Sequence, residues 1–239
     1  MLQHIAVTDL TLITRNPAAL QGWADKGVRV LAGHHGDSDS LKAGYQGADI
    51  LFMISSLAVG QRIEHHRDAL NIAKAAGIKH ITYTSVAGTH PANPTPSATE
   101  HIATEQMLWQ SGISFTALRN QMYAEIFYTM ISEQALPTGR WMHNSKTGGF
   151  SPVARTDIAA CAAAIMLSPE RHDKVVYEIT GSERFTFPDI AKLASQLWHQ
   201  PIEYVAISDE QMYEFFDGLG IPRTGDPSQT FMPLLFGSD

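Results

Sequence analysis

Short apolar runs alternate along the chain with longer segments whose apolar positions recur at helical spacing. The runs are rich in β-branched residues and predict buried β-strands at residues 10–14, 28–33, 48–56, 79–88 and 113–127. The segments between them predict helices at residues 17–27, 37–47, 62–77 and 100–112. Strands that alternate with helices in this way indicate an open parallel sheet covered on both faces.

Particular residues mark several ends of the predicted helices and strands. Asp37 or Ser38 caps the second helix, and Gly77 ends the third, where a left-handed residue is needed. Residues 89–100, rich in Pro and Thr, predict a loop directly after a strand, where loops commonly carry substrate contacts. After Leu136 the pattern changes to short strands, turns and helices, which indicates a smaller cap packed on the sheet.

Composition excludes several classes of protein. The chain has 239 residues, 44% of them hydrophobic, and a formal net charge of −7 with both signs interspersed. We therefore expect one domain with a modest appendage and no nucleic-acid footprint. No apolar stretch is long enough to span a bilayer, and the first residues lack the pattern of a signal peptide. The only cysteine, Cys161, reads as a small buried apolar residue, and we expect a reduced, soluble, cytoplasmic protein.

Hydroxyl side chains follow two neighbouring strands of the predicted sheet. Ser55 and Ser56 end one apolar run, and Thr84 lies with Ser85 at the end of the next. Sheets of this kind bind ligands beyond the carboxyl ends of their strands. The same hydroxyls could instead only hydrogen-bond the following turn, so both interpretations stay open.

Cationic and amide side chains occur at two further strand ends or helix starts. Gln61 and Arg62 begin a predicted helix, where backbone amides and a cation could meet a phosphate. Arg15 follows the strand at 10–14, where a guanidinium could bind a ribose 2′-phosphate and favour NADP over NAD. Alone, Arg15 would be read as a solvated surface residue.

The histidines are weaker candidates for functional residues than the side chains at the strand ends. His101 and Glu105 share a helix face, but two ligands are too few for a zinc site, and we expect no bound metal. His101 could supply a proton, because histidine changes charge near neutrality, or could be a plain surface residue. The adjacent His65 and His66 are best explained by a solvated helix surface.

Common catalytic motifs are absent. The sequence has no G-x-S-x-G nucleophile motif, no P-loop and no glycine-rich phosphate turn. It also lacks a Tyr-x-x-x-Lys pair, because Phe127 stands four residues after Tyr123.

A set of segments in order carries a family resemblance: TRNPA, ADILFMISS, VGQR, AAGIKHITYTS, EHIATEQML, GISFTALRNQMYAE, VARTDIAA and YEITG. Together they resemble the NmrA-like branch of the atypical short-chain dehydrogenases, and within it the bacterial NAD(P)H:quinone oxidoreductases and triphenylmethane reductase. The match covers most of residues 10–220, and LRNxxY followed by R-x-D-I-A is its most specific part.

The resemblance implies an α/β fold: a Rossmann-like doubly wound parallel sheet with a small C-terminal α+β lobe. The NAD(P)-binding domain would cover residues 1–136 and the substrate lobe 137–239, some of whose strands and helices return to the main sheet. NADP(H) would deliver hydride to a quinone-like or planar aromatic acceptor. The sequence does not give the oligomeric state, so a homodimer stays open.

The resemblance also implies roles for individual residues. Arg15 would bind the 2′-phosphate, and Ser55, Ser56 and Gln61 would line the pyrophosphate and nicotinamide side. Thr84, Asn120 and Tyr123 would line the nicotinamide and acceptor pocket. His101 would also lie at this pocket, because it falls where related plant reductases carry a catalytic lysine.

Two departures from the family pattern change the functional expectation. The first strand and its glycine-rich turn are missing, so we expect a first βα unit to be absent and cofactor binding to be impaired in this truncated chain. His34 stands where the family usually has an acidic residue beside the adenine.

Three hypotheses follow. The protein is an NADPH-dependent reductase, a non-catalytic NADP-sensing regulator of the NmrA type, or a silent remnant whose open sheet edge favours self-association.

Overall fold

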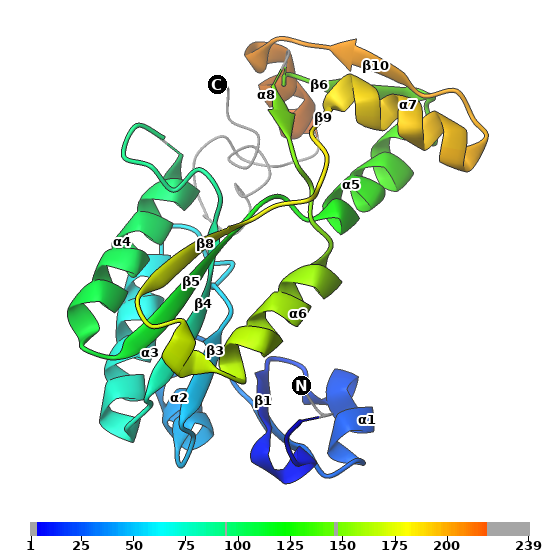
Figure 1. Ribbon diagram of the computed structural model, residues 1–239. Coiled ribbons are helices and arrows are strands. Elements are labelled where there is room, and N and C mark those ends of the chain that lie inside the picture. The colour runs from blue at the N-terminus through cyan, green and yellow to red at the C-terminus, as the bar shows by residue number, and fades with distance from the viewer. Residues whose placement is uncertain (1–3, 94, 146–147, 219–239) are drawn as a thin grey trace. The chain divides into compact units, whose positions relative to one another are not determined.

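The computed structural model describes residues 4–93, 95–145 and 148–218, which form two compact units (Figure 1). One unit is built from the described residues within 1–85, 100–118 and 160–177, and the other from those within 86–99, 119–159 and 178–218. The two units interleave along the chain, and the proposed boundary between residues 136 and 137 stays a prediction.

The first unit contains two sheets. Strands β1 (Thr11–Thr14) and β2 (Arg29–Ala32) form a parallel pair. The second sheet has the order β3–β4–β5–β8, from β3 (Ile50–Met53), β4 (His80–Val86), β5 (Ser114–Asn120) and β8 (Val175–Ile179). β8 comes from the region predicted as the smaller lobe. The last residues of β4, β5 and β8 are assigned to the second unit.

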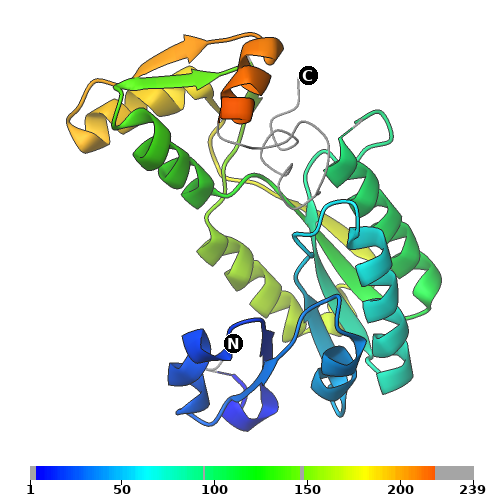
Figure 2. The same ribbon diagram turned by 180° about the vertical axis from the view of Figure 1, so that it is seen from behind.

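Helices cover both faces of the four-stranded sheet. α3 (Arg62–Ala76) and α4 (Pro96–Ser111) lie on one face and α6 (Arg155–Met166) on the other, as the two opposite views show (Figures 1 and 2). The apolar core between sheet and helices includes Leu70, Ile81, Leu108 and Phe115. The chain therefore has the predicted Rossmann-like α/β fold.

The β1–β2 pair carries its own short helices, η1 (Val7–Asp9), η2 (Pro17–Leu20) and α1 (Gln21–Ala24), and α2 (Ser38–Tyr45) packs on it. A Cβ at Gly44 of α2 would collide with Ile13 of β1, so glycine allows this close approach. Among the described residues, no strand pairing joins β1 to β3. The two sheets of this unit are thus held by side-chain packing rather than by one hydrogen-bonded ladder.

The second unit combines small sheets with helices. β6 (Arg140–His143) pairs parallel with β10 (Glu203–Ala206), and β7 (Gly149–Phe150) pairs antiparallel with β9 (Phe185–Thr186). The remaining elements of the chain are α5 (Ala124–Met130), the π-helical η3 (Ile131–Ala135), η4 (Pro169–Arg171, in the first unit), α7 (Phe187–Trp198) and α8 (Asp209–Gly218). The core of the second unit contains the aromatic residues Phe127, Trp141 and Phe187 among aliphatic side chains.

Most predicted caps and helices are confirmed. The Asp37 side chain accepts a hydrogen bond from the Ser40 N–H at the start of α2, and Gly77 ends α3 with φ 79°. The predicted helix at 17–27 is shorter than expected, because it breaks into a 3-10 turn and one helical turn.

Two predicted boundaries are wrong. The Pro-rich loop ends earlier than expected, because α4 begins at Pro96, after Thr95 accepts a hydrogen bond from the Ala98 N–H. The strand predicted over 113–127 ends at Asn120, and helix α5 begins at Ala124. Apolar residues 124–127 therefore belong to a buried helix face, which a short window does not distinguish from a strand.

Among the helices that the structure describes, none combines the length and apolar character needed to cross a membrane.

Candidate functional site

Two of the predicted ligand-binding hydroxyls lie together at the end of the main sheet. The β3–α3 loop, defined here as residues 54–61, begins beside the carboxyl end of β4, because Met53 is in register with Tyr83. The Ser55 N–H donates to Thr84 Oγ1 at 2.8 Å, and the Thr84 hydroxyl donates to Ser55 Oγ at 3.4 Å. Strand register thus places Ser55 and Thr84 as one hydroxyl pair.

Ser56 and Gln61 belong to the same loop. The Ser56 hydroxyl accepts a hydrogen bond from the Ala58 N–H at 3.2 Å, so it also shapes the turn. Gln61 is exposed at the N-terminal end of α3 and makes no side-chain capping bond. Both residues lie on the loop beyond a strand end, where sheets of this type bind ligands.

Arg15 lies in the other sheet of the first unit. It follows β1 directly and is exposed. The Gly33 N–H donates to the Thr14 carbonyl at 2.9 Å, so the chain segments after β1 and β2 start side by side. Among the described residues, no carboxylate forms an ion pair with Arg15. Its charge is therefore available to an anion.

His101 is a buried residue, which excludes the surface interpretation. Only 4% of His101 is exposed, and its Nδ1 lies 2.7 Å from the Tyr83 hydroxyl oxygen. Burial, with a further contribution from the nearby Arg62 charge, lowers the pKa of His101 to about 3. Burial therefore favours the neutral imidazole near pH 7, which argues against His101 as a charged proton donor, and its place at the acceptor pocket stays a prediction.

The sequence predicts that Arg62 could meet a phosphate, but its side chain is buried inside the first unit instead. It is 2% exposed, and its Nη1 forms an ion pair with Glu100 Oε2 at 3.0 Å. Ser85 is also occupied internally, because its hydroxyl donates to Glu105 Oε1 at 2.7 Å. Both side chains are turned toward α4 and serve the interior of the first unit.

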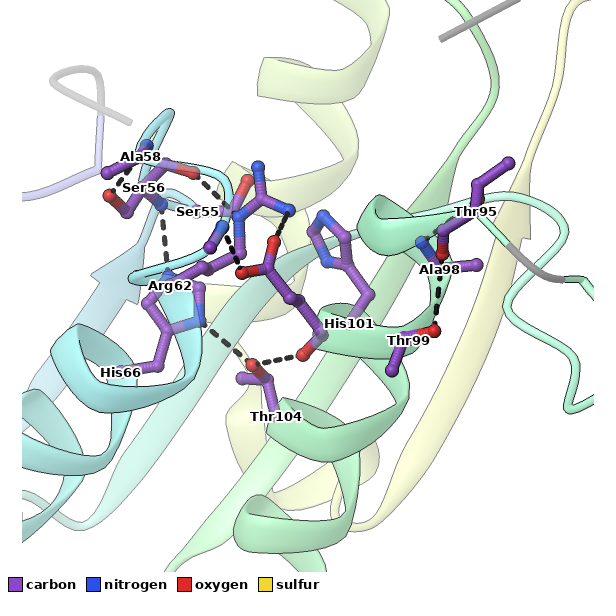
Figure 3. A network of polar contacts seen from close by, with 12 residues as sticks. Ser55, Ser56, Ala58, Arg62, His66, Thr95, Ala98, Thr99, His101 and Thr104 are labelled. Carbon is purple, nitrogen blue, oxygen red and sulfur yellow. Dashed lines mark hydrogen bonds and ion pairs between the residues drawn. The ribbon is translucent and has the colours of Figure 1, made fainter. Parts of the chain in front are cut away.

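His66 corrects a further expectation. The sequence predicts a solvated position, but His66 is fully buried and contacts the Thr104 hydroxyl oxygen through Nδ1 at 2.9 Å (Figure 3). A signal for this pairing was present in the sequence. Arg62 and His66 are four residues apart on α3, and Glu100 and Thr104 are four apart on α4, so each helix presents two polar groups on one face.

Asn120 and Tyr123 lie in the second unit. Asn120 is 2% exposed, yet its Oδ1 and Nδ2 have no hydrogen-bond partner among the described residues. Its carbonyl accepts a hydrogen bond from the Ala87 N–H. An unpaired buried amide is unfavourable unless a ligand or water satisfies it.

Tyr123 is the residue before α5 rather than part of a strand. Its ring lies 4.8 Å from the Arg155 guanidinium carbon, and Glu125 accepts from the Arg155 N–H at 3.0 Å. The arginine and the helix start thus hold the tyrosine in place.

No group of three or more His, Cys, Asp or Glu side chains suited to a metal ion occurs in the described ranges.

Comparisons with known proteins agree with this fold. Quinone oxidoreductase 2 of Escherichia coli (strain K12) is 34% identical over 222 residues, which cover 93% of this chain and 77% of that protein. The NAD(P)H azoreductase of Xenophilus azovorans is 24% identical over 212 residues, or 89% of this chain and 73% of the azoreductase.

Two solved structures are similar to this chain in fold. The NADPH complex of the NADPH-dependent quinone oxidoreductase QOR2 from Escherichia coli matches with a TM-score of 0.85 and 32% identity, over 98% of this chain and 82% of that one. The NADP(H) complex of the Citrobacter sp. triphenylmethane reductase matches with a TM-score of 0.82 and 26% identity, over 98% and 83% of the two chains. The model of the NmrA-like family matches residues 6–229, and the chain belongs to this family.

Proposed function

We propose that the protein is an NADPH-dependent reductase that transfers hydride to a quinone-like or planar aromatic acceptor. The observation that carries this proposal is the buried Asn120 amide, which lacks a hydrogen-bond partner among the described residues. A donor and an acceptor held ready at a strand end suit a carboxamide or carbonyl ligand. Relatives named as quinone oxidoreductase and azoreductase support the same reaction class.

The side chains fit the cofactor. NADPH carries a 2′-phosphate, and the exposed Arg15 has no ion-pair partner among the described residues that would compete with it. Ser55 and Thr84 form a neutral hydroxyl pair beside a strand end, which suits the uncharged nicotinamide side. We assign Arg15 to the 2′-phosphate, and Ser55, Ser56 and Gln61 to the pyrophosphate and nicotinamide side.

Thr84, Asn120 and Tyr123 are assigned to the nicotinamide and acceptor pocket. Bound NADPH would supply a hydride, that is, two electrons and one proton, and a quinone would need one more proton to become a hydroquinone. Because the pKa of His101 is about 3, this residue does not supply that proton as an imidazolium at neutral pH. We place His101 as a neutral hydrogen-bonding group, and the second proton comes from water.

The first experiment titrates NADPH against the purified chain and follows nicotinamide fluorescence, then measures NADPH oxidation with a soluble quinone. We expect saturable but weakened NADPH binding, because the sequence has no glycine-rich phosphate turn, and slow acceptor-dependent oxidation. Arg15→Ala should weaken NADPH binding about tenfold and leave NADH binding unchanged, because only NADPH carries the 2′-phosphate. The exposed Arg67 on α3 gives the matched control, and Arg67→Ala should change neither affinity.

Two outcomes would contradict the proposal. Equal losses of NADPH and NADH affinity in Arg15→Ala would reject the phosphate assignment. Tight NADPH binding without oxidation by any quinone or dye would favour the regulatory hypothesis over the reductase.

A further inference from the structure

The backbone of the β3–α3 loop is held by buried side chains of α3 and α4. The Ser56 N–H donates to His66 Nε2 at 3.0 Å, and the Ser56 carbonyl accepts from Arg62 Nε at 2.7 Å (Figure 3). The Gly60 N–H donates to Glu100 Oε1 at 2.6 Å. Both polar groups of the Ser56 backbone and one of Gly60 are therefore fixed by side chains rather than by neighbouring backbone.

The ion pair at the centre of this arrangement is almost inaccessible to water. Arg62 and Glu100 have side-chain exposures of 2% and 6%, and Nη1 and Oε2 are 3.0 Å apart. A buried ion pair is a poor device for stability alone, because its desolvation offsets much of its attraction. Each partner also directs a second polar atom at the loop, Arg62 through Nε and Glu100 through Oε1. The ion pair therefore joins the two side chains and also orients both of them toward the β3–α3 loop.

The hydrogen-bond directions around His66 are determined by their partners. The Ser56 N–H can only donate, so His66 Nε2 is the acceptor and Nδ1 carries the proton. Nδ1 donates to Thr104 Oγ1 at 2.9 Å, and the Thr104 hydroxyl donates to the Glu100 carbonyl at 2.8 Å. Burial, with smaller contributions from His35, His101, Arg62 and His65, lowers the pKa of His66 to about 2, so the neutral form that accepts from Ser56 persists near neutral pH.

We propose that Arg62, Glu100 and His66 are positioning residues for the cofactor, which act by holding the β3–α3 loop in its binding conformation. This inference rests on the proposed function, because Ser55 and Ser56 of this loop are assigned to NADPH. A loop ordered before binding loses less conformational freedom when the ligand arrives. Glu100 directly precedes His101 on α4, so the same helix turn fixes the loop and carries the buried histidine.

Thr104 offers a test that changes no cofactor contact and no charge. Thr104→Val keeps the shape but removes the acceptor of the His66 N–H, which frees the imidazole to turn away from Ser56. We expect the Kd for NADPH to rise about tenfold, since one buried hydrogen bond biases a conformational equilibrium by about that factor. The kcat at saturating NADPH should change less than about twofold, because the loop then closes on the cofactor. Thr104→Ser restores a hydroxyl and should restore the Kd.

Amide hydrogen exchange of the cofactor-free chain gives a second readout. The Ser56 amide should be protected in the unsubstituted chain and in Thr104→Ser, and should exchange about tenfold faster in Thr104→Val. Glu100→Gln should release the Gly60 amide in the same way. Asp49→Asn, which breaks the exposed ion pair between Lys79 and Asp49, is the matched control and should change neither exchange nor Kd.

Each outcome has a distinct meaning. Lower thermal stability in Thr104→Val with unchanged Kd and unchanged Ser56 exchange would overturn the positioning role and leave a purely structural one. An absence of NADPH binding by the unsubstituted chain would instead overturn the proposed function, and the cofactor part of this inference with it. The exchange measurement would still report whether the side chains hold the loop.

Discussion

Both units of the molecule have an apolar core, but they differ in the side chains that accompany it. Beneath the β3–α3 loop of the first unit, Arg62, Glu100 and His66 are buried as a connected set of hydrogen bonds. The core of the second unit holds a cluster of aromatic rings among aliphatic side chains, and in this cluster Phe127 stacks on Phe150 with centroids 4.6 Å apart. In that core the Trp141 N–H is buried without a partner among the described residues.

This difference shows what each interior specifies. A satisfied polar network has one arrangement of donors and acceptors, so it can fix the backbone of a loop. A cluster of aromatic rings gains mainly from buried area and shape. The polar interior therefore suits a ligand-binding loop, and the aromatic one suits the framework of a small lobe.

The largest expected effect comes from breaking the buried ion pair. Arg62→Ala leaves Glu100 charged in a buried site and should lower the free energy of unfolding by about 3–5 kcal/mol. Chemical denaturation followed by circular dichroism measures it. The double variant Arg62→Ala with Glu100→Ala should lose less than the sum of the single losses. Strict additivity would show that the two side chains do not interact.

Low pH should reduce the free energy of unfolding, because the folded protein keeps its buried histidines neutral. Burial lowers the pKa of His66 to about 2, of His101 to about 3 and of His143 to about 4, from an ordinary value of 6.5. Below pH 6.5 the unfolded chain takes up protons that the folded chain does not. Stability should therefore fall by about 1 kcal/mol per pH unit for each histidine, down to its folded pKa.

Thermal unfolding measured between pH 7 and pH 5 tests this slope. A variant that replaces His66 with a neutral residue should have a flatter slope. Exposed His199 provides the control, and His199→Asn, which tolerates the left-handed φ of 52°, should leave the slope unchanged. A slope that is identical in all three chains would show that His66 is not buried as a neutral group.

A smaller loss of stability is expected from a substitution among the aromatic rings of the second unit. Phe187→Leu removes part of a buried ring that contacts Phe127, Trp141 and Phe150. Unfolding should become easier by about 1–2 kcal/mol, because leucine fills only part of the space. Denaturant titration measures this loss, and NADPH affinity should stay unchanged. A large change in affinity would contradict the separation of the two interiors.

The smallest expected effect concerns the start of α7. Thr186 accepts a hydrogen bond from the Asp189 N–H, and Asp189 accepts from the Thr186 N–H, which forms a capping box. Thr186→Ala should reduce stability by about 1 kcal/mol in the same denaturation experiment. Thr186→Ser keeps the capping oxygen and should retain most of it. Equal losses in both variants would show that the hydroxyl does not cap the helix.

The amino-acid pattern alone predicts the alternation of strands and helices, the Asp37 and Gly77 caps, and the polar strand ends with Ser55, Thr84 and Asn120. These features follow from local rules: apolar periodicity, capping geometry and the position of residues after a strand. The family resemblance also came from the order of short segments, which needs no structure.

The roles of the buried polar residues become visible only in the folded chain. Arg62 and His66 resemble surface residues in sequence because a charge or an imidazole usually lies in water. They are buried because Glu100 and Thr104, more than thirty residues away, satisfy them across two packed helices. Burial in the folded unit likewise lowered the pKa of His101. The i, i+4 spacing shows which residues share a helix face, but local pattern does not show which other element supplies their partners.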